Sequence, residues 1–267
     1  STTAGLVVGG VGTSPSREAK ETEIWNGSSW TEVGDISRPA STQSFGTAGA
    51  SSTSALIFGG EPGTTYYTYT EKWDGSSWTE VNNLNTGRQD PAGFGIVTAA
   101  ICAGGYSPPA PPGNVVANNE SWDGTNWTEV NDLNTARREL AGGGASNTNA
   151  LAIGGNLGPA ATAAVEKWNG SNWTNVTSLN TARRLNAAAG ATNEAIITFG
   201  GLGPPTYNLT ESYNGTNWTE VGDLNTARYQ HAGMGTSTSA LSVGGDPGSS
   251  AICELWNGTN WTEVNNV

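Results

Sequence analysis

The chain has 267 residues, enough for one large all-β domain or two ordinary ones. It carries 23 acidic and 11 basic residues, for a net charge of −12. This balance argues against binding to nucleic acid or to an anionic membrane surface, because both need a basic patch. Membrane insertion is not expected either, because no apolar run approaches the roughly 20 residues that cross a bilayer. The start of the chain lacks the basic segment and long apolar core of a signal peptide.

Aromatic residues recur along the chain as pairs five positions apart. The first aromatics of successive pairs are separated by 48, 49, 46, 45 and 43 residues. A Gly-Gly dipeptide precedes each pair, and linkers of the type Leu-Asn-Thr-Ala-Arg join the repeats, the first of them degenerate. Six repeats of this length, spread over residues 1–267, are typical of the blades of one β-propeller domain. The pairs are Trp25/Trp30, Trp73/Trp78, Trp122/Trp127, Trp168/Trp173, Tyr213/Trp218 and Trp256/Trp261.

Each repeat is predicted to form four strands, A to D, in chain order. Strand A is rich in small residues, as over 44–49 and 140–145, which suits a narrow channel where backbones crowd together. Strand B is apolar and stops at the Gly-Gly, as over 55–58, 150–153 and 195–199. Strand C carries a glutamate two residues before its aromatic, so both side chains lie on one face. An Asn-Gly or Asp-Gly turn then leads into strand D.

The inner strand of the first repeat is missing from this pattern. The sequence supplies six B, six C and six D strands but only five A strands. The chain opens within an A–B hairpin and stops at Val267, where a further linker would follow. We expect a first blade without its innermost strand, either because the chain is a piece of a longer product or because a neighbouring molecule supplies the strand. Strand exchange or oligomer formation through this blade is part of that expectation.

The Gly-Gly that ends the second strand, the aromatic that ends the third and the Trp that opens the fourth resemble kelch repeats over nearly the full chain. This resemblance implies a single six-bladed propeller of four-stranded blades. The spacing of the two aromatics is tighter than in most kelch units. The near-identical repeated phrases also resemble kelch-like proteins of marine phage and environmental bacteria, which implies an extracellular or virion-associated setting.

One face of such a propeller is predicted to bind a partner. In an up-and-down blade the B–C and D–A loops emerge together; the D–A loops carry the arginines, and the B–C loops repeat poorly and hold most of the tyrosines. Loops diversified on one face of a repeated scaffold are typical of a binding surface, and the kelch resemblance implies the same face. The candidate binding residues are Arg38, Arg88, Arg137, Arg138, Arg183, Arg184, Arg228, Tyr66, Tyr67, Tyr106 and Tyr207.

Two interpretations of the repeated arginines stay open at this point. One arginine and one strand-C glutamate recur in the repeats, so the two can pair within or between blades without any ligand. Alternatively, the arginines form a free cationic rim that binds carboxylates, sulfates or acidic side chains through bidentate contacts.

The tryptophans also have two interpretations. As structure, aromatics at fixed positions in every blade pack one blade against the next. As function, they stack on sugar rings, because the turn Trp-Asp-Gly-x-x-Trp resembles a hairpin of six-bladed fucose-binding lectins. In those lectins Trp, Arg and Glu form a pocket at each blade junction. The glutamate here lies two rather than three residues before the Trp.

Catalytic groups are scarce. The single histidine, His231, has no partners for a metal site, so neither a metal nor a cofactor is expected. A kelch-type copper oxidase needs two histidines and a cross-linked Tyr-Cys pair, which this chain cannot supply. Cys102 and Cys253 fall in different repeats and are expected to be buried thiols in strands. A glycosidase that uses Asp90 or Glu139 at the channel mouth stays open as the enzymatic alternative.

We therefore predict a non-catalytic binding module that recognises a glycan or a protein through its B–C and D–A loops. The alternatives are a multivalent sugar binder with sites between blades, and a structural or assembly protein such as a virion decoration.

Overall fold

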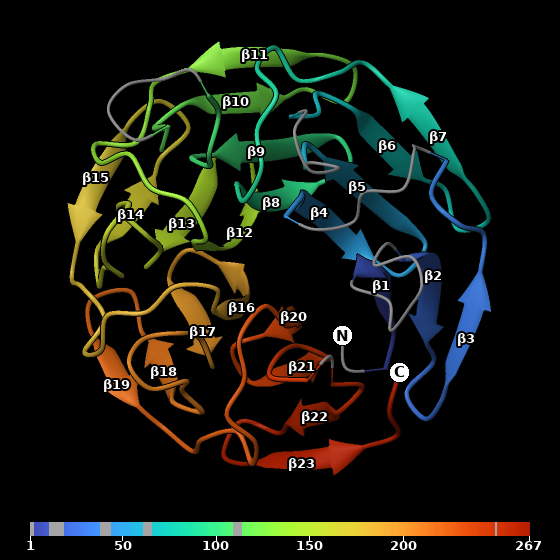
Figure 1. Cartoon of the computed structure of the whole chain (residues 1–267), viewed down its shortest axis with the longest axis vertical. Coiled ribbons are helices and arrows are strands. Elements are labelled where there is room, and N and C mark those ends of the chain that lie inside the picture. Colours follow the sequence, from blue (N-terminus) through green and yellow to red (C-terminus); the bar gives the residue numbers. More distant parts are fainter. Residues whose placement is uncertain (1–2, 11–18, 38–43, 61–65, 109–113, 249) are drawn as a thin grey trace.

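The computed structural model describes residues 3–10, 19–37, 44–60, 66–108, 114–248 and 250–267. Six antiparallel sheets are arranged in a ring around a central channel (Figure 1), and none of the described residues is helical. The predicted all-β, six-bladed propeller is therefore confirmed. The described residues accordingly contain no helix that is long and apolar enough to span a membrane.

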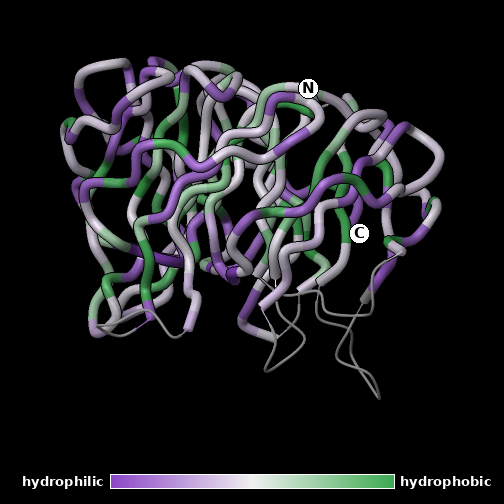
Figure 2. The backbone as a smooth tube through the Cα atoms, turned by 90° about the horizontal axis from the view of Figure 1, so that it is seen from above, coloured by the Kyte–Doolittle hydropathy of each residue, from purple (hydrophilic) through white to green (hydrophobic). Residues whose placement is uncertain are grey.

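Each blade is one sheet whose strands follow one another outward from the channel. The first sheet has three strands in the order β1-β2-β3, and the other five have four. Figure 2 shows the ring from the side, with strands that run between two faces that carry loops. The strands are β1 Gly5–Gly10, β2 Ala19–Trp25 and β3 Trp30–Val33; β4 Gly46–Ser51, β5 Ser54–Phe58, β6 Thr70–Trp73 and β7 Trp78–Val81; β8 Ala92–Ile96, β9 Ala99–Ala103, β10 Asn119–Trp122 and β11 Trp127–Val130; β12 Ala141–Ser146, β13 Asn149–Ile153, β14 Val165–Trp168 and β15 Trp173–Val176; β16 Ala187–Thr192, β17 Ala195–Phe199, β18 Thr210–Tyr213 and β19 Trp218–Glu220; and β20 Ala232–Thr236, β21 Ser239–Val243, β22 Cys253–Trp256 and β23 Trp261–Val264.

The inner strands begin one or two residues later than predicted. Strand β4 starts at Gly46 rather than at residue 44, because Ser44 has a φ of 72° and cannot extend the strand. Strand β12 starts at Ala141 rather than at residue 140. The apolar B strands match their predicted ranges to within one residue, and β17 matches fully.

Small residues on the inner strands allow these strands to pack closely around the channel. A Cβ placed on Gly142 of β12 would come within 2.1 Å of the Phe94 ring and 2.8 Å of the Gly93 carbonyl oxygen. Any side chain there would force neighbouring blades apart. The channel that results has a volume of about 720 Å³ and is lined mainly by glycine and alanine backbone.

The aromatic pairs lock each blade internally and against its neighbour. Within a pair the ring centroids lie 4.9 to 5.4 Å apart. The first Trp is tied to its own A–B hairpin, as where Trp122 Nε1 donates to the Val97 carbonyl oxygen at 2.9 Å. The second Trp reaches the preceding blade, as where Trp127 Nε1 donates to Thr70 Oγ1 at 3.0 Å. The packing interpretation of the tryptophans is therefore the one that the structure shows.

A series of backbone hydrogen bonds runs around the mouth of the channel. Just before each of the inner strands β4, β8, β12, β16 and β20 lies a non-glycine residue with a φ between 54° and 72°. The amides of the last four donate in turn to the carbonyl oxygen of the counterpart in the preceding blade, at 2.7 to 3.1 Å, so that the series starts at the Ser44 carbonyl oxygen. These shared bonds hold a backbone conformation that non-glycine residues rarely adopt. The residues are Ser44, Asp90, Glu139, Leu185 and Gln230.

Both cysteines are buried free thiols in strands, Cys102 in β9 and Cys253 in β22. Burial raises the pKa of Cys102 to about 11, so the neutral thiol is its form at physiological pH.

Candidate functional site

Four of the predicted arginines lie in the interior instead of on the loop face. Each is at most 1% exposed and forms an ion pair with a strand-C glutamate that is equally buried. Arg88 Nη2 lies 2.9 Å from Glu120 Oε1, and Arg137 Nη1 lies 3.1 Å from Glu166 Oε1. The other two pairs are Arg183 with Glu211 and Arg228 with Glu254.

The rest of the linker converges on the same glutamate. In the third blade the amide and the side chain of Asn85 donate to Glu120 Oε2 at 2.7 and 2.8 Å, and the Thr86 amide donates to Oε1 at 3.3 Å. Leu84 packs into the apolar core between the second and third blades. The Leu-Asn-Thr-x-Arg phrase is therefore a structural unit that satisfies a buried carboxylate.

The same arginine also ties its linker to the blade before it. The amide of Gly60 donates to the Arg88 carbonyl oxygen at 2.9 Å, and a Cβ on Gly59 would lie only 2.7 Å from that oxygen. The recurring Gly-Gly and the recurring arginine are thus two halves of one contact.

Structural pairing, rather than a free cationic rim, is what the structure shows for Arg88, Arg137, Arg183 and Arg228. Their guanidinium groups are out of reach of a ligand at the surface, because burial around an ion pair leaves no exposed donor. Arg38 lies outside the described residues. The sequence left both interpretations open; in the structure the linker runs inward beneath strand C, which buries these side chains.

The residue that follows each buried arginine is partly exposed. Its backbone pairs with the first residue after the Gly-Gly, so the D–A linker and the B–C loop are joined by a short two-residue bridge. This backbone contact recurs from blade to blade, whereas the side chains of the residues that make it differ. The bridged pairs are Gln89 with Tyr106, Arg138 with Asn156, Arg184 with Leu202, and Tyr229 with Asp246.

Two of these partly exposed residues are the doubled arginines, and they form a cluster with carboxylates from neighbouring blades. Arg184 Nη1 lies 2.5 Å from Glu139 Oε2, and Asn156 Nδ2 donates to the same oxygen at 3.1 Å. Arg138 lies 3.5 Å from Glu139 and 3.8 Å from Asp90, measured between the nearest N and O atoms. The arginines are 24% and 31% exposed, and the carboxylates 8% and 9%. We call these five residues the arginine–carboxylate cluster.

The cluster has a buried layer of carboxylates and a partly exposed layer of guanidinium groups. Burial, followed by the nearby charge of Glu139, raises the pKa of Asp90, although a hydrogen bond from Ser44 opposes the shift. The carboxylates therefore sit on the protein side and the two guanidinium groups on the solvent side. Because each guanidinium has five N–H donors and only one or two are engaged here, both retain donors for an incoming acceptor.

Two predicted tyrosines adjoin the cluster and two do not. Arg138 lies over the Tyr106 ring at 4.9 Å from the centroid, and Tyr66 lies 5.8 Å from Tyr106 between centroids. By contrast, Tyr67 packs against Tyr69 in its own loop, and Tyr207 lies 5.9 Å from the buried Arg183.

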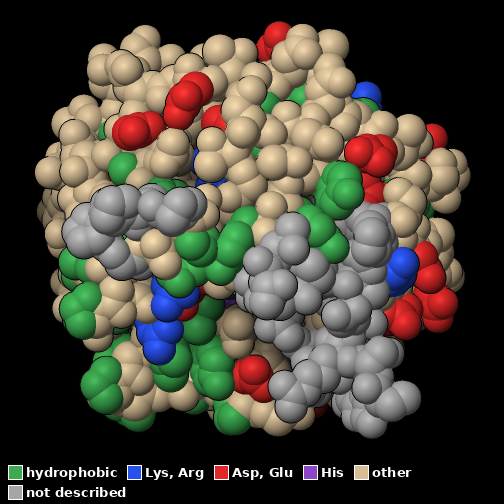
Figure 3. Space-filling model, turned by 45° about the horizontal axis from the view of Figure 1, so that its top comes forward, with side chains coloured by type: hydrophobic (Ala, Val, Ile, Leu, Met, Phe, Trp, Pro, Cys, Tyr) green, Lys and Arg blue, Asp and Glu red, His purple; other side chains and the backbone are tan. Residues whose placement is uncertain are grey.

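The assembled surface is a small basic and aromatic area beside the channel mouth. Figure 3 shows, on the face that carries the B–C loops, a group of basic side chains bordered by hydrophobic ones. We refer to Arg138, Arg184, Tyr66 and Tyr106 together with the carboxylates beneath them as the loop-face site.

Sequence reasoning missed the members of the bridged pairs other than Arg138, Arg184 and Tyr106, and one of them, Asn156, is only 4% exposed. Gln89, Asn156, Leu202, Tyr229 and Asp246 all occupy positions defined by the repeat but differ in side chain from blade to blade. One signal could have found them: the position directly after the repeated Arg or the repeated Gly-Gly is fixed by the repeat, but the residue at that position differs from blade to blade.

The histidine and most of the tryptophans, which sequence analysis considered for a metal centre and for a sugar site, are buried. His231 is buried against Phe199, with ring centroids 5.5 Å apart. Over the part of the chain that the structure describes, no three His, Cys, Asp or Glu side chains gather as metal ligands. Ten of the tryptophans are at most 7% exposed and Trp30 is half-buried, so the C–D hairpins offer no open ring face for stacking on sugars.

Comparisons with known proteins show a shared fold and assign no function. No protein-family model matches the chain, and no curated protein matches it. Among solved structures, the one described as "Structure of YjhT" superimposes with a TM-score of 0.72 at 13% sequence identity, covering 92% of this chain and 91% of that one. Similarity at this level of identity establishes the shared six-bladed propeller architecture.

Proposed function

We propose that this propeller is a non-catalytic binding module that recognises an acidic glycan or an acidic segment of a protein through the loop-face site. One observation carries the proposal: Arg138, Arg184, Tyr66 and Tyr106 come from four different blades and meet beside the channel mouth on the face whose loops vary. Residues that vary on a repeated scaffold and converge in space are the pattern expected of recognition.

The chemistry of the site supports an acidic ligand. Two partly exposed guanidinium groups can bind a carboxylate or a sulfate through paired N–H donors. The adjoining tyrosines supply flat apolar surface with polar edges, which suits either a sugar ring or a peptide. We further propose that the repeats are of the kelch type and that the protein acts outside the cell or on a virion.

The proposal is tested with a glycan and peptide array probed with three forms of the protein. We expect wild type to bind acidic ligands and the Arg138→Ala/Arg184→Ala variant to bind them at least about tenfold more weakly. The double variant is expected to melt at a lower temperature, because Asp90 and Glu139 lose their counter-charges, so the array is probed at a temperature at which circular dichroism shows both proteins to be folded. Lys167→Ala is the matched control, because Lys167 forms an exposed ion pair with Glu194 near an A–B hairpin on the opposite face.

Other outcomes separate the alternatives. Binding that survives in the double variant at several sites per chain would support sugar sites between blades. Absence of binding by the wild type to any ligand would favour a structural or assembly role. Turnover of an array glycan that depends on Asp90 or Glu139 would instead support the glycosidase alternative.

A further inference from the structure

Asp90 and Glu139 occupy the same position in neighbouring blades, directly before the inner strands β8 and β12. Both residues have a left-handed backbone, with φ of 54° and 56°, and the Glu139 amide donates to the Asp90 carbonyl oxygen at 3.1 Å. Their side chains are 9% and 8% exposed. The corresponding residues of three other blades are uncharged: Ser44, Leu185 and Gln230. The repeat therefore does not require a carboxylate here, and these two are particular to the loop-face site.

Each of the two carboxylates forms an ion pair with an arginine of the next blade. Arg138 Nη1 lies 3.8 Å from Asp90 Oδ2, and Arg184 Nη1 lies 2.5 Å from Glu139 Oε2. Arg138 also lies 3.5 Å from Glu139, which accepts a further hydrogen bond from the uncharged Asn156. Two positive and two negative charges cancel, so the cluster is neutral when both carboxylates are ionised. An anion that approaches the guanidinium groups then meets N–H donors but no net positive charge.

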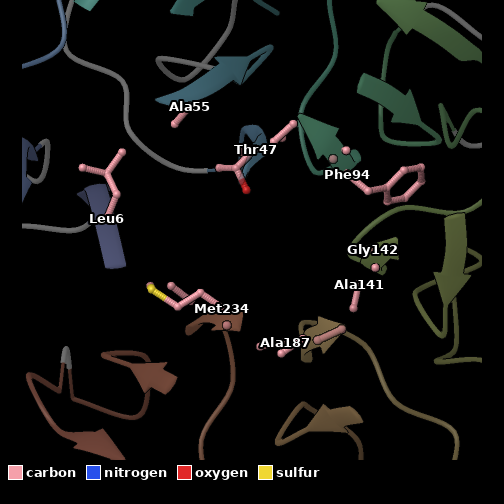
Figure 4. Close-up of a pocket in the computed structure, with 18 of the residues that line it drawn as sticks. Leu6, Thr47, Ala55, Phe94, Ala141, Gly142, Ala187 and Met234 are labelled. Atoms are coloured by element: carbon pink, nitrogen blue, oxygen red, sulfur yellow. The ribbon is translucent and has the colours of Figure 1, made fainter. Parts of the chain in front are cut away.

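The channel side of the cluster supplies no further charge. Small and apolar residues line the channel, among them Ala141, Ala187 and Met234 (Figure 4). Of the described residues that line it, His231 alone is titratable. Burial, and after it the charge of Arg228, lowers the pKa of His231 to about 3. None of these channel-lining residues therefore changes its charge between pH 5 and pH 8, which leaves the two carboxylates as the titrating groups of the cluster.

Asp90 is the carboxylate with the weaker ionic support. Its ion pair with Arg138 is the longer one, and its other contacts are hydrogen bonds from the uncharged Gln89 and Ser44. Glu139, by contrast, lies against both guanidinium groups. Burial, opposed by the Ser44 bond and reinforced by the charge of Glu139, raises the pKa of Asp90. A bound anion adds another negative charge nearby, which favours the protonated form of Asp90 further.

A proton on Asp90 also has an acceptor within the cluster. The side-chain oxygen of Gln89, Oε1, is buried and accepts no hydrogen bond from any described residue. It belongs to the same amide group whose Nε2 donates to Asp90 Oδ2 at 3.2 Å. A neutral carboxyl group can donate its O–H to this oxygen while it still accepts from Nε2. The protonated form of Asp90 thus satisfies a buried acceptor that the ionised form leaves without a donor.

We propose that the loop-face site binds one singly charged oxyanion, a carboxylate or a sulfate ester, and that Asp90 takes up one proton from solvent as the anion binds. This inference rests on the proposed function and specifies its ligand class and its pH dependence. With the proton, two positive charges face one negative charge, and one singly charged anion restores neutrality. Binding therefore strengthens as the pH falls.

The probes are glucose 6-sulfate and methyl glucuronide, because each carries one anionic group that stays ionised between pH 5 and pH 8. Titrations of the isotope-labelled protein are followed by nuclear magnetic resonance through the side-chain Nε–H signals of Arg138 and Arg184. They give a dissociation constant at each pH. The affinity of the wild type is expected to rise as the pH falls, by up to about tenfold per pH unit, which is the limit for uptake of one proton.

Two variants assign the proton to its residue. Asp90→Asn carries a neutral side chain at every pH, so it is expected to bind at pH 8 at least about tenfold more tightly than wild type and without pH dependence. Glu194→Gln is the matched control, because it removes one negative charge from an A–B hairpin on the opposite face. It should keep the affinity and the pH dependence of the wild type. Circular dichroism at each pH checks that all three proteins are folded.

Equal wild-type affinity at pH 5 and pH 8, or a wild-type pH dependence in Asp90→Asn, would overturn this inference and leave the proposed function standing. A gain in Glu194→Gln as large as that in Asp90→Asn would also overturn it, because the cause would then be overall charge. If neither probe moves the Arg138 or Arg184 signal at any pH, both proposals fail. Binding of only one probe, with the expected pH dependence, supports the inference and identifies the anionic group.

Discussion

Replacing Arg88 with alanine is expected to destabilise the propeller by about 3–5 kcal/mol, because it leaves the Glu120 carboxylate buried without its counter-charge. The pair is at most 1% exposed at both ends and is linked by a 2.9 Å hydrogen bond. Arg88 also donates to the backbone oxygen of Cys102 at 3.3 Å, so the substitution removes a second contact. Chemical denaturation with urea, monitored by tryptophan fluorescence, measures the loss.

Two matched variants show whether the buried charge is the cause. Arg184→Ala removes a guanidinium that is 31% exposed and should change stability by less than about 1 kcal/mol. Adding Glu120→Gln to Arg88→Ala should recover part of the lost stability, because the amide needs no counter-charge. Equal losses for Arg88→Ala and Arg184→Ala would contradict the structural role of the repeated arginines.

The second large effect concerns the stability of the folded protein at acidic pH. Burial, and after it the positive charge of Arg228, lower the pKa of His231 from 6.5 to about 3. The unfolded chain therefore binds a proton near pH 6.5, whereas the folded chain binds one only near pH 3. The contribution of His231 to stability is fully present above pH 6.5 and is lost as the pH falls toward 3, by about 1.4 kcal/mol per pH unit.

His231→Asn is expected to remove this component of the acid sensitivity. Asparagine suits the position, since Asn186 occupies it in the preceding blade and donates to Thr198 Oγ1 at 2.7 Å. Between pH 7 and pH 4.5 the wild type should lose about 2–3 kcal/mol more unfolding free energy than the variant. Comparing the change with pH, rather than stability at one pH, cancels the packing lost with the imidazole ring. Parallel pH profiles would contradict the account.

The fold could be predicted from the sequence because each blade carries several independent local signals. The Gly-Gly, the paired aromatics and the Asn-Gly turns are local signals, and their six-fold recurrence fixes the ring. The bounds of β4 and β12 were wrong by one or two residues, because Ser44 and Glu139 take a left-handed conformation that is stabilised by hydrogen bonds between blades. Such bonds depend on tertiary structure and leave no mark on local sequence.

The candidate site could be predicted only in part. Repetition alone does not separate an arginine kept for a ligand from one kept for a buried glutamate, because both recur at the same period. Arg88 and Arg138 differ only in which side of the linker they face, and that depends on the linker's inward path beneath strand C. The convergence of Tyr66, Tyr106 and Arg138 is likewise a product of ring closure, since these residues come from three different repeats.

The division between buried and outward arginines is measured most directly by chemical labelling of the native protein with phenylglyoxal, followed by mass spectrometry of each arginine-containing peptide. The account predicts that Arg138 and Arg184 react at least about tenfold faster than Arg88, Arg137, Arg183 and Arg228, since the latter react only through local or global opening. In denaturant the six rates should converge. Fast native-state labelling of the four repeated arginines would contradict the account, because it would mean that they, too, face a ligand at the surface.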